Sequence, residues 1–449
     1  MELYRSKMVE RVRLPDRNAR DAALTEAGYN VFNLDSSDVF VDLLTDSGTG
    51  TMSDAQWAAL LRGDEAYAGS KSFSALQTAV EDVTGFDHVI PVHQGRGGEN
   101  VLYGALLESG DYVPNNTHFD TTRGHVANNG GEPVDCPTPE GTDPDSNLPF
   151  KGNMDVEAVR QLADDVGAER IPAVILTITN NSMAGQPVSV ENTRAVRDVA
   201  DELDATFVID ACRFAENASF VKSREAEFKD HSIVEIAREQ LGYADAILVS
   251  GKKDGLVNVG GFLAFAPGQE ALFERCKQRT IMYEGFPTYG GMAGRDLAAL
   301  AVGLREAAEE GYVQSRIEQV RRLGDQLLDA GVPIYQPTGG HAVYLDADRA
   351  VPHLPSEQFP GQSLVCELYR EGGVRGVELG SFAFPGADRP EFVRLALPRR
   401  TYHDEHLAHV AETGRAVMDQ ATELPGYEVV EEPPIPELRH FSARLEPVE

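Results

Sequence analysis

The sequence predicts an α/β protein whose large domain contains a mainly parallel sheet of about seven strands, followed by a smaller α/β domain. Two patterns support this prediction. Between about residues 85 and 265, short β-rich apolar runs alternate with helical stretches, which is typical of a parallel sheet. After the sheet, an amphipathic helix carries Ile317, Val320, Leu323 and Leu327 on one face. We expect residues 1–45 to form an arm and part of the small domain, residues 46–300 the large domain, and residues 301–449 the small domain.

Local signals place the individual elements in order. The run at residues 39–44 predicts a first strand, and Ser53 with Gln56 predicts a helix that begins with a capping box. Trp57, Leu60 and Leu61 follow at helical spacing. A proline- and aspartate-rich stretch predicts a surface loop at 136–150. The remaining expected elements are strands at 89–92, 174–178, 206–209, 246–249 and 440–445, and a helix at 192–203.

The charge of the chain limits its partners. Seventy-two acidic residues against 40 basic ones leave a net charge of −32, which should repel nucleic acid and anionic membranes. The acidic residues are spread along the chain, so we expect a halophilic setting in which salt screens their repulsion. The N-terminus lacks the apolar core of a signal peptide, and no run of about 18 apolar residues occurs, which predicts a cytoplasmic location. The four cysteines show no Cys-x-x-Cys spacing, so neither a zinc site nor a disulfide framework is indicated.

Two adjacent lysines, Lys252 and Lys253, follow the apolar run at 246–249. A lysine at the end of a buried strand must be desolvated or partnered. Its amine could form a Schiff base with a cofactor aldehyde. The alternative is a surface turn with two solvated lysines, and this stretch alone does not decide between them.

Asp210 directly follows another apolar strand, 206–209. A buried carboxylate needs a cationic partner, which the protonated ring nitrogen of pyridoxal phosphate would provide. The alternative is an aspartate that caps the next helix. A strand ending in Asp, then a helix, then a strand ending in Lys is the order that an enzyme using this cofactor needs.

Two further stretches could bind anions. The glycine-rich turn at 93–100 would offer backbone N–H groups at a helix start, with Arg96 adding a charge, or it could be purely structural. Arg394 lies within an apolar run of the small domain, where it would pair with a substrate carboxylate or with a structural acid.

Taken together, these stretches closely resemble the aromatic amino-acid β-eliminating lyases, the family of tryptophanase and tyrosine phenol-lyase. The resemblance runs nearly end to end. It covers residues 42–49, 62–70, 93–97, 185–189, 213–218, 250–254, 284–291 and 393–395. It implies the aspartate-aminotransferase-like fold, fold type I of the pyridoxal-phosphate enzymes, and a small amino-acid substrate.

The resemblance also implies a role for each matching residue. Lys253 would be the Schiff-base lysine, with Lys252 tuning the site, and Asp210 would hold the pyridine nitrogen. Tyr67 resembles the proposed general acid of the family. The other implied cofactor contacts are Gln94, Gly95, Arg96 and Ser250 for its phosphate, Phe119 for stacking on its pyridine ring, and Asn181 and Arg213 for the phenolic oxygen of that ring. The implied substrate contacts are Arg394 for the carboxylate, with Thr45, Ser47 and Asn181 nearby.

A monovalent cation and an assembly are implied in the same way. Glu65, with the backbone carbonyls of Gly48 and Asn258, resembles a potassium site shared between subunits, and oxygen ligands suit such a hard cation. The resemblance implies a homotetramer.

Three positions favour an indole leaving group over a phenol. Leu379 stands where phenol-lyases carry an arginine for the phenol oxygen, so an apolar ring fits better. Asp120 and His440 match the tryptophanase branch at two further positions, and both are candidates, beside Tyr67, for protonating the leaving group. The expected reaction is conversion of L-tryptophan to indole, pyruvate and ammonia. The alternative is a tyrosine phenol-lyase, or another β-eliminating lyase with a thiol leaving group.

Overall fold

The computed structural model describes residues 4–386, 389–434 and 438–448, and the chain divides into two compact units. Unit 1 contains Ser47–Ile317, and unit 2 contains Tyr4–Asp46 together with the chain from Glu318 onward. The boundary falls within helix α13 (Glu310–Asp329). The three-part domain division expected from the sequence stays a prediction.

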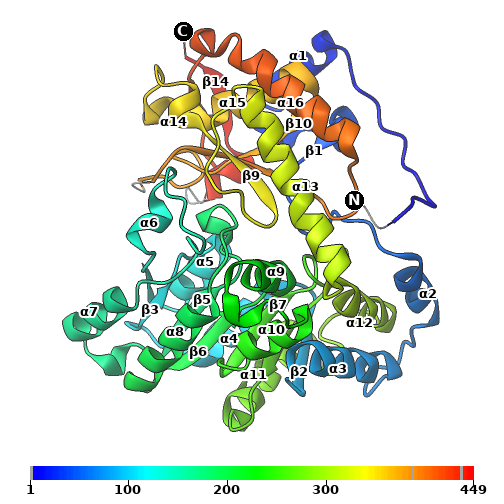
Figure 1. The fold of residues 1–449 in the computed structure, drawn as a ribbon, viewed down its shortest axis with the longest axis vertical. Coiled ribbons are helices and arrows are strands. Elements are labelled where there is room, and N and C mark those ends of the chain that lie inside the picture. Colours follow the sequence, from blue (N-terminus) through cyan, green and yellow to red (C-terminus); the bar gives the residue numbers. More distant parts are fainter. Residues whose placement is uncertain (1–3, 387–388, 435–437, 449) are drawn as a thin grey trace. The chain divides into compact units, whose positions relative to one another are not determined.

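Unit 1 is built on a seven-stranded sheet in which only the pairings of β8 are antiparallel (Figure 1). The predicted mainly parallel sheet is therefore confirmed. Strands β5, β7 and β8 are buried at every position, which explains their continuous apolar runs. In sheet order the strands are β2 (His88–Val92), β8 (Gly261–Phe265), β7 (Ala246–Ser250), β6 (Thr206–Asp210), β5 (Ala173–Thr177), β3 (Tyr112–Asn115) and β4 (Glu132–Asp135).

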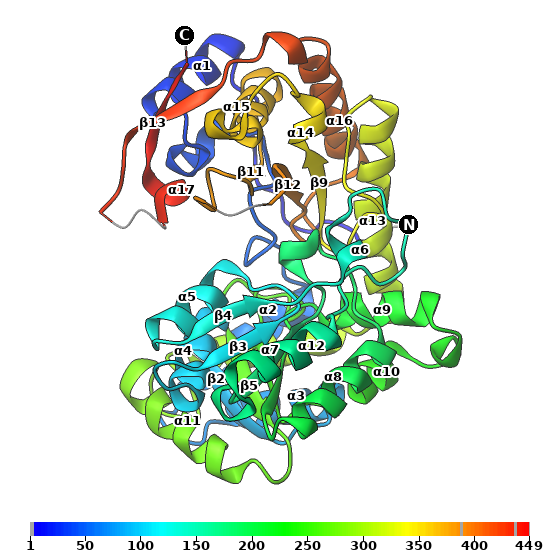
Figure 2. The same ribbon diagram turned by 90° about the vertical axis from the view of Figure 1, so that its left-hand side faces the viewer.

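Helices cover both faces of this sheet, and each face has its own apolar core (Figures 1 and 2). One face is covered by α4 (Gly95–Leu106), α5 (Asp120–Asn128) and α11 (Glu270–Tyr283). The other is covered by α3 (Lys71–Thr84), α7 (Val156–Val166), α8 (Val190–Glu202), α9 (Phe214–Arg224), α10 (Ile233–Leu241) and α12 (Gly294–Ala307). With both faces covered, the strand ends are left for a ligand site. Among the described helices, none combines the length and apolarity needed to cross a membrane.

Helix α2 (Asp54–Arg62) begins with the predicted capping box between Ser53 and Gln56. Its buried face differs from the expected one, because Gln56 is fully buried whereas Trp57 and Leu61 are exposed. The Gln56 side-chain amide donates to the backbone carbonyls of Leu256 (2.9 Å) and Ala299 (3.4 Å). Gln56 therefore ties α2 to the rest of unit 1.

Replacing Gln56 with alanine should lower the free energy of unfolding by about 1–3 kcal/mol, because two buried carbonyls lose their donor. Trp57→Ala, on the exposed side of the same helix, is the matched control and should change it by less than about 1 kcal/mol. Urea unfolding followed by circular dichroism measures both, since Trp57 is the single tryptophan and fluorescence would be lost with it. Equal effects of the two substitutions would contradict the assignment.

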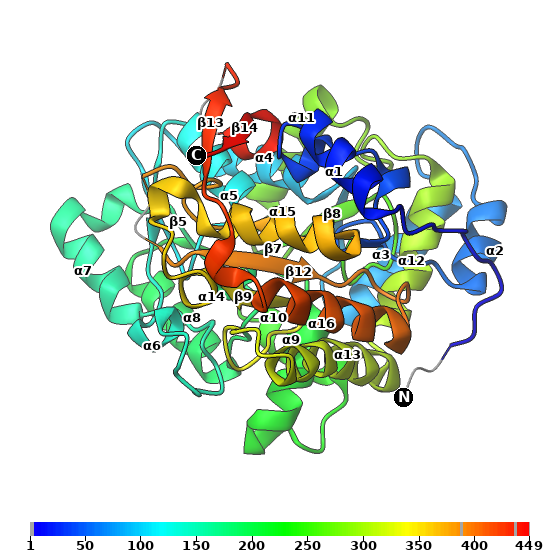
Figure 3. The ribbon, with the colours of Figure 1, turned by 90° about the horizontal axis from the view of Figure 1, so that it is seen from above.

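Unit 2 contains short sheets packed against helices. The three-stranded sheet has the order β11 (Val377–Glu378), β12 (Phe392–Ala396) and β9 (Ala342–Asp346). Helix α15 (Pro360–Gly372) packs against β12 and beside α16 (Asp404–Met418) (Figure 3). The two remaining pairs are β1 (Val41–Asp42) with β10 (Val374–Arg375), and β13 (Tyr427–Glu431) with β14 (Arg444–Pro447).

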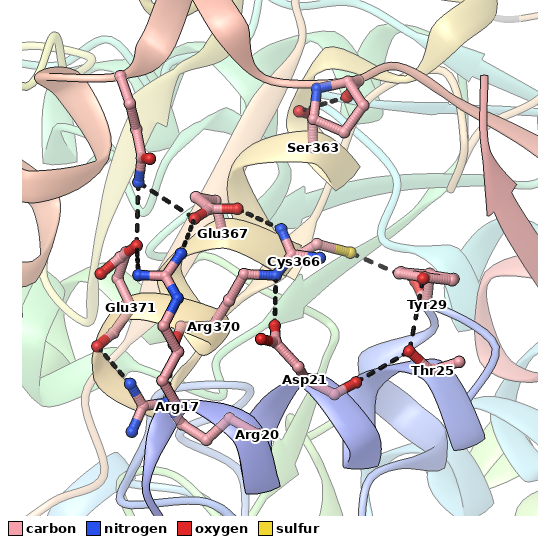
Figure 4. A network of polar contacts seen from close by, with 12 residues as sticks. Arg17, Arg20, Asp21, Thr25, Tyr29, Ser363, Cys366, Glu367, Arg370 and Glu371 are labelled. Atoms are coloured by element: carbon pink, nitrogen blue, oxygen red, sulfur yellow. Dashed lines mark hydrogen bonds and ion pairs between the residues drawn. The ribbon is translucent and has the colours of Figure 1, made fainter. Parts of the chain in front are cut away.

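The N-terminal helix α1 (Arg17–Glu26) belongs to unit 2 because polar contacts join it to α15 (Figure 4). The Arg20 guanidinium donates to the carbonyls of Arg370 (2.8 Å) and Glu371 (2.7 Å), and Arg370 donates to Asp21 (2.7 Å). These contacts attach the start of the chain to a helix about 350 residues further on.

Three further elements differ from their predictions. The first strand, expected at 39–44, is limited to β1 (Val41–Asp42). The predicted strand at 440–445 begins as a short helix, α17 (Arg439–Ser442), in which His440 is buried. The predicted surface loop at 136–150 contains the short helix α6 (Pro139–Thr142), and Cys136 and Gly141 within it are buried. Unit 2 also contains the short helix α14 (Ala347–Ala350).

Candidate active site

The carboxyl ends of β6 and β7 bring Asp210 and the lysine pair to one edge of the sheet. The two strands are parallel neighbours, with Asp210 paired in register with Leu248. The turn after β7 is held by Asp254, whose carboxylate accepts the backbone N–H groups of Ala215 (2.8 Å) and Glu216 (3.3 Å) at the start of α9. A buried acid directly after Lys253 therefore fixes the lysine turn against the chain that follows Asp210.

The structure gives the two lysines different surroundings. The Lys252 amine donates to the side-chain oxygen of Gln94 (3.3 Å). Burial lowers the pKa of Lys252, and the charges of Lys253 and Arg96 lower it further. Across the described part of the chain, the Lys253 amine makes no hydrogen bond or ion pair. Both lysines are partly buried, so the solvated turn is excluded, and Lys253 has the amine that is available for a covalent bond.

The glycine-rich turn begins α4, and no side-chain cap from Gln94 occupies the N–H groups of its first turn, although Gly97 and Gly98 donate to the backbone carbonyl of Gln94. A Cβ on Gly95 would lie 2.9 Å from the Cβ of Ser250, so only glycine allows this close approach to the end of β7. Arg96 follows with an exposed side chain. These groups form an anion site suited to a phosphate.

One pocket of unit 1 contains most of these groups. It has a volume of about 440 Å³, including the part that is open to solvent. Its lining residues are Ser47, Gln94, Gly95, Arg96, Glu99, Phe119, Thr121, Asp210, Cys212, Leu248, Ser250, Lys252 and Lys253. An unpaired amine, a buried carboxylate, an aromatic ring and an anion site in one pocket fit pyridoxal phosphate. The predicted residues that the structure brings together are therefore Ser47, Gln94, Gly95, Arg96, Phe119, Asp210, Ser250 and Lys253.

Asn181 and Arg213 do not line this pocket, although both are buried and both follow strands of the same sheet. Asn181 follows β5 in a 3₁₀ turn, and Arg213 immediately precedes α9. They stand at the same sheet edge as Asp210, because β5 and β6 are parallel neighbours.

Glu99 is a pocket residue to which the sequence reasoning assigned no role. It is buried on α4, and its carboxylate accepts the Thr122 hydroxyl (2.6 Å). Burial raises its pKa to about 7, and the charge of Asp210 contributes in the same direction. The sequence signal that could have identified Glu99 as a pocket residue is its position four residues after Gly95, on the same helix face.

Two candidate proton donors lie in unit 1 outside the pocket lining. Tyr67 is exposed, and its ring contacts the rings of Phe286 and Tyr289. A hydrogen bond with Tyr289 raises the pKa of Tyr67, so its hydroxyl keeps its proton at neutral pH. Asp120 is the first residue of α5, and the next residue, Thr121, lines the pocket.

Four predicted site residues belong to unit 2. Arg394 is in β12 and donates to the carbonyl of Leu44 (3.1 Å), next to Thr45 in sequence. Leu379 is buried directly after β11. His440 is buried, and burial, with the charges of Arg394 and Arg439, lowers its pKa to about 4, so its imidazole is neutral at pH 7.

The predicted cation ligands are only partly together. Asn258 donates its side-chain amide to the carbonyl of Gly48 (2.9 Å). Gly48 has a positive φ, and a Cβ there would lie 2.9 Å from the carbonyl oxygen of Asn258. Glu65 pairs instead with Arg295 (3.1 Å). Gly48 and Asn258 therefore lie close together, whereas the Glu65 carboxylate has a different partner in this chain.

Comparisons with known proteins agree with this site. A family model described as "Beta-eliminating lyase" matches residues 42–413. The chain is 64% identical to the "Probable tryptophanase" of Halobacterium salinarum, with 100% of both chains covered. It is 48% identical to the "Tryptophanase" of Salinibacter ruber (100% of this chain, 95% of that protein) and 46% identical to the "Tyrosine phenol-lyase" of Symbiobacterium sp. (100% and 98%).

Solved structures agree on the fold. An aspartate aminotransferase double mutant from Thermus thermophilus matches with a TM-score of 0.61 and 19% identity, over 90% of this chain and 97% of that one. The predicted aspartate-aminotransferase-like fold, fold type I, is thereby confirmed. Family and fold both support pyridoxal phosphate as the cofactor, which the pocket residues fit. With a family model that spans most of its length and close relatives over its full length, this chain belongs to the beta-eliminating lyase family.

Proposed function

We propose that this protein is a pyridoxal-phosphate-dependent lyase that converts L-tryptophan to indole, pyruvate and ammonia. The observation that carries the proposal is the pocket that combines the unpaired Lys253 amine, buried Asp210 and the Arg96 turn. The full-length similarity to proteins named tryptophanase supports the choice of substrate.

In the proposed reaction each residue has a defined task. When bound, the cofactor supplies an aldehyde for the substrate amine and an electron-withdrawing ring for the charge formed at Cα. Lys253 holds the cofactor and then removes the Cα proton of the substrate. Asp210 holds the proton on the ring nitrogen, and Arg96 with the α4 N–H groups binds the phosphate. Arg394 would bind the substrate carboxylate, with Thr45 and Ser47 as further substrate contacts. Asn181 and Arg213 would hold the phenolic oxygen of the cofactor, and Phe119 would contact the cofactor ring.

Indole leaves only after its C3 atom is protonated, so the site needs an acid. The low pKa of His440 leaves no acidic imidazolium proton at pH 7, which favours Tyr67 as the donor, with Asp120 as the other candidate. Tyr67 keeps its proton in this range because its pKa is raised.

We further propose a potassium ion at the carbonyl oxygens of Gly48 and Asn258, completed by Glu65 across a subunit interface of a homotetramer. The closeness of Gly48 and Asn258 supports this, and Glu65 would have to exchange its pairing with Arg295. A cytoplasm of high salt would screen the net charge of −32.

Product identification tests the function. The cofactor-loaded protein given L-tryptophan should release indole, pyruvate and ammonia in equal amounts. Release of phenol from L-tyrosine at a higher kcat/KM would instead favour the alternative, a tyrosine phenol-lyase, which the 46% identity to such an enzyme makes the second candidate.

Leu379→Arg should shift the preference from tryptophan toward tyrosine by roughly tenfold or more, because a guanidinium would favour a phenol oxygen and disfavour an apolar ring. Leu379→Met, which conserves volume, is the control and should keep the preference for tryptophan. The measurement is the ratio of kcat/KM for the two amino acids. An unchanged ratio in the arginine variant would contradict the role of Leu379.

A further inference from the structure

The chain that carries Leu379 is held in place by buried carboxyl groups. We call residues 379–384, which follow β11, the Leu379 loop. The Glu378 carboxylate accepts the backbone N–H groups of Gly380 (2.6 Å), Phe382 (3.2 Å) and Ala383 (2.8 Å). A single side chain, itself 2% exposed, therefore fixes the path of this loop.

A second carboxyl group holds the same loop from Glu391, which is also 2% exposed. Its Oε1 atom accepts the backbone N–H of Ser381 (3.0 Å). A Cβ on Gly380 would lie 2.0 Å from Oε2 of Glu391 and 2.7 Å from Oε1 of Glu378. The two carboxyl groups thus converge on one backbone position, where only glycine fits.

The groups around Glu378 and Glu391 provide little positive charge to compensate two carboxylates. From α14, Asp348 accepts the backbone N–H of Glu391 (3.1 Å), and its charge raises the pKa of Glu391 further. Arg389 acts in the opposite direction. From α17, Arg439 donates to the carbonyls of Ser381 (2.6 Å) and Phe382 (2.8 Å), not to the carboxyl groups.

His440 lines a small pocket together with Glu378, and its low pKa leaves it neutral at pH 7. It therefore adds no positive charge beside the pair under these conditions.

Two carboxylates this close together in a buried site do not both ionise. Burial, with the charge of Glu391, raises the pKa of Glu378 to about 8, and burial raises the pKa of Glu391. The oxygens of Glu378 face N–H donors, whereas Oε2 of Glu391 is buried and has no hydrogen-bond partner among the described residues. The proton of the pair therefore belongs on Glu391.

We propose that Glu378 and Glu391 share one proton and act as positioning residues that set the place of Leu379, and with it the choice of leaving group. This rests on the proposed function, in which Leu379 favours an indole leaving group over a phenol. The two coupled carboxyl groups lose their one proton as a pair, and the raised pKa of about 8 marks that loss. The pair therefore stabilises the folded loop while it holds the proton and loses this stabilisation as the pH rises through about 8. Discrimination in favour of an aromatic leaving group should fall over the same range.

Hydrogen exchange in the full-length, cofactor-loaded protein tests the loop directly. At pH 7, Glu378→Gln should speed exchange of the 380, 382 and 383 amides by roughly tenfold or more, because an amide offers one acceptor oxygen where the carboxylate offers two. Glu391→Gln keeps an acceptor for Ser381 and carries no charge. At pH 7 the amides of this variant should exchange near the wild-type rate. Above pH 8 the wild-type amides should exchange faster than those of the variant at the same pH, because the variant lacks the alkaline opening of the loop.

Selectivity provides the second measurement: the ratio of kcat/KM for L-tryptophan to that for S-methyl-cysteine, whose small leaving group does not need Leu379. This ratio should fall in Glu378→Gln, should fall above pH 8 in the wild type, and should stay level in Glu391→Gln. Wild-type exchange and selectivity in Glu378→Gln, or an unchanged alkaline response in Glu391→Gln, would overturn the proposal. If Glu378→Gln fails to fold by circular dichroism, the Glu391→Gln comparison decides. A wild-type protein that does not cleave tryptophan would refute the proposed function instead, while exchange would still decide the role of the pair.

Discussion

Replacing Lys253 with alanine is expected to lower kcat/KM for L-tryptophan by roughly 10²–10⁴-fold or more, which is the contribution of a positioned general base. It should also prevent covalent attachment of the cofactor. The reason is geometric, since Lys253 has the unpaired amine in the pocket, whereas Lys252 donates to Gln94. Borohydride reduction of the loaded protein, followed by peptide mass spectrometry, identifies the modified lysine.

Lys252→Ala is the matched control, because it removes a neighbouring amine from the same pocket. It should keep the cofactor on Lys253 and reduce activity by a smaller factor. A cofactor attached to Lys252 in the wild type, or equal losses in the two variants, would contradict the division of roles.

Asp210→Asn is expected to lower kcat by roughly 10²–10³-fold, which is the usual cost of removing one preorganised charge from a reacting centre. The substitution preserves shape, and asparagine can still accept the N–H of Cys212, which lies 3.2 Å from the Asp210 carboxylate. The fold should therefore persist, and circular dichroism with cofactor binding checks that it does. The loss should appear in kcat because the charge acts on the reacting ring.

Asp210→Glu separates charge from position. It keeps the carboxylate but displaces it, so it should retain more activity than Asp210→Asn. Wild-type turnover in the asparagine variant would show that the carboxylate does not hold the ring nitrogen.

The sheet could be predicted because its strands are buried on both faces and therefore appear as short continuous apolar runs. The same logic located Asp210 and the lysine pair, since each directly follows such a run. The burial of Gln56 could not be predicted in this way. Its partners are the carbonyls of Leu256 and Ala299, which are 200 and 243 residues away, and no local periodicity reveals them.

The site shows the same division. Choosing Lys253 over Lys252 depended on the family resemblance, and the structure adds a physical difference through the contact of Lys252 with Gln94. The carboxyl pair of Glu378 and Glu391 escaped prediction because the two residues are separated in sequence and meet only through the turn at Gly380. Each of them taken alone looks like an ordinary acidic residue in a chain that has many.

The most direct test of the central claim is a competition between L-tryptophan and L-tyrosine at equal concentrations in one reaction, run with the loaded protein in potassium chloride. Indole and phenol are quantified by chromatography. The proposed function predicts that indole forms in large excess and matches the pyruvate released. Phenol in excess, or pyruvate without indole, would contradict it.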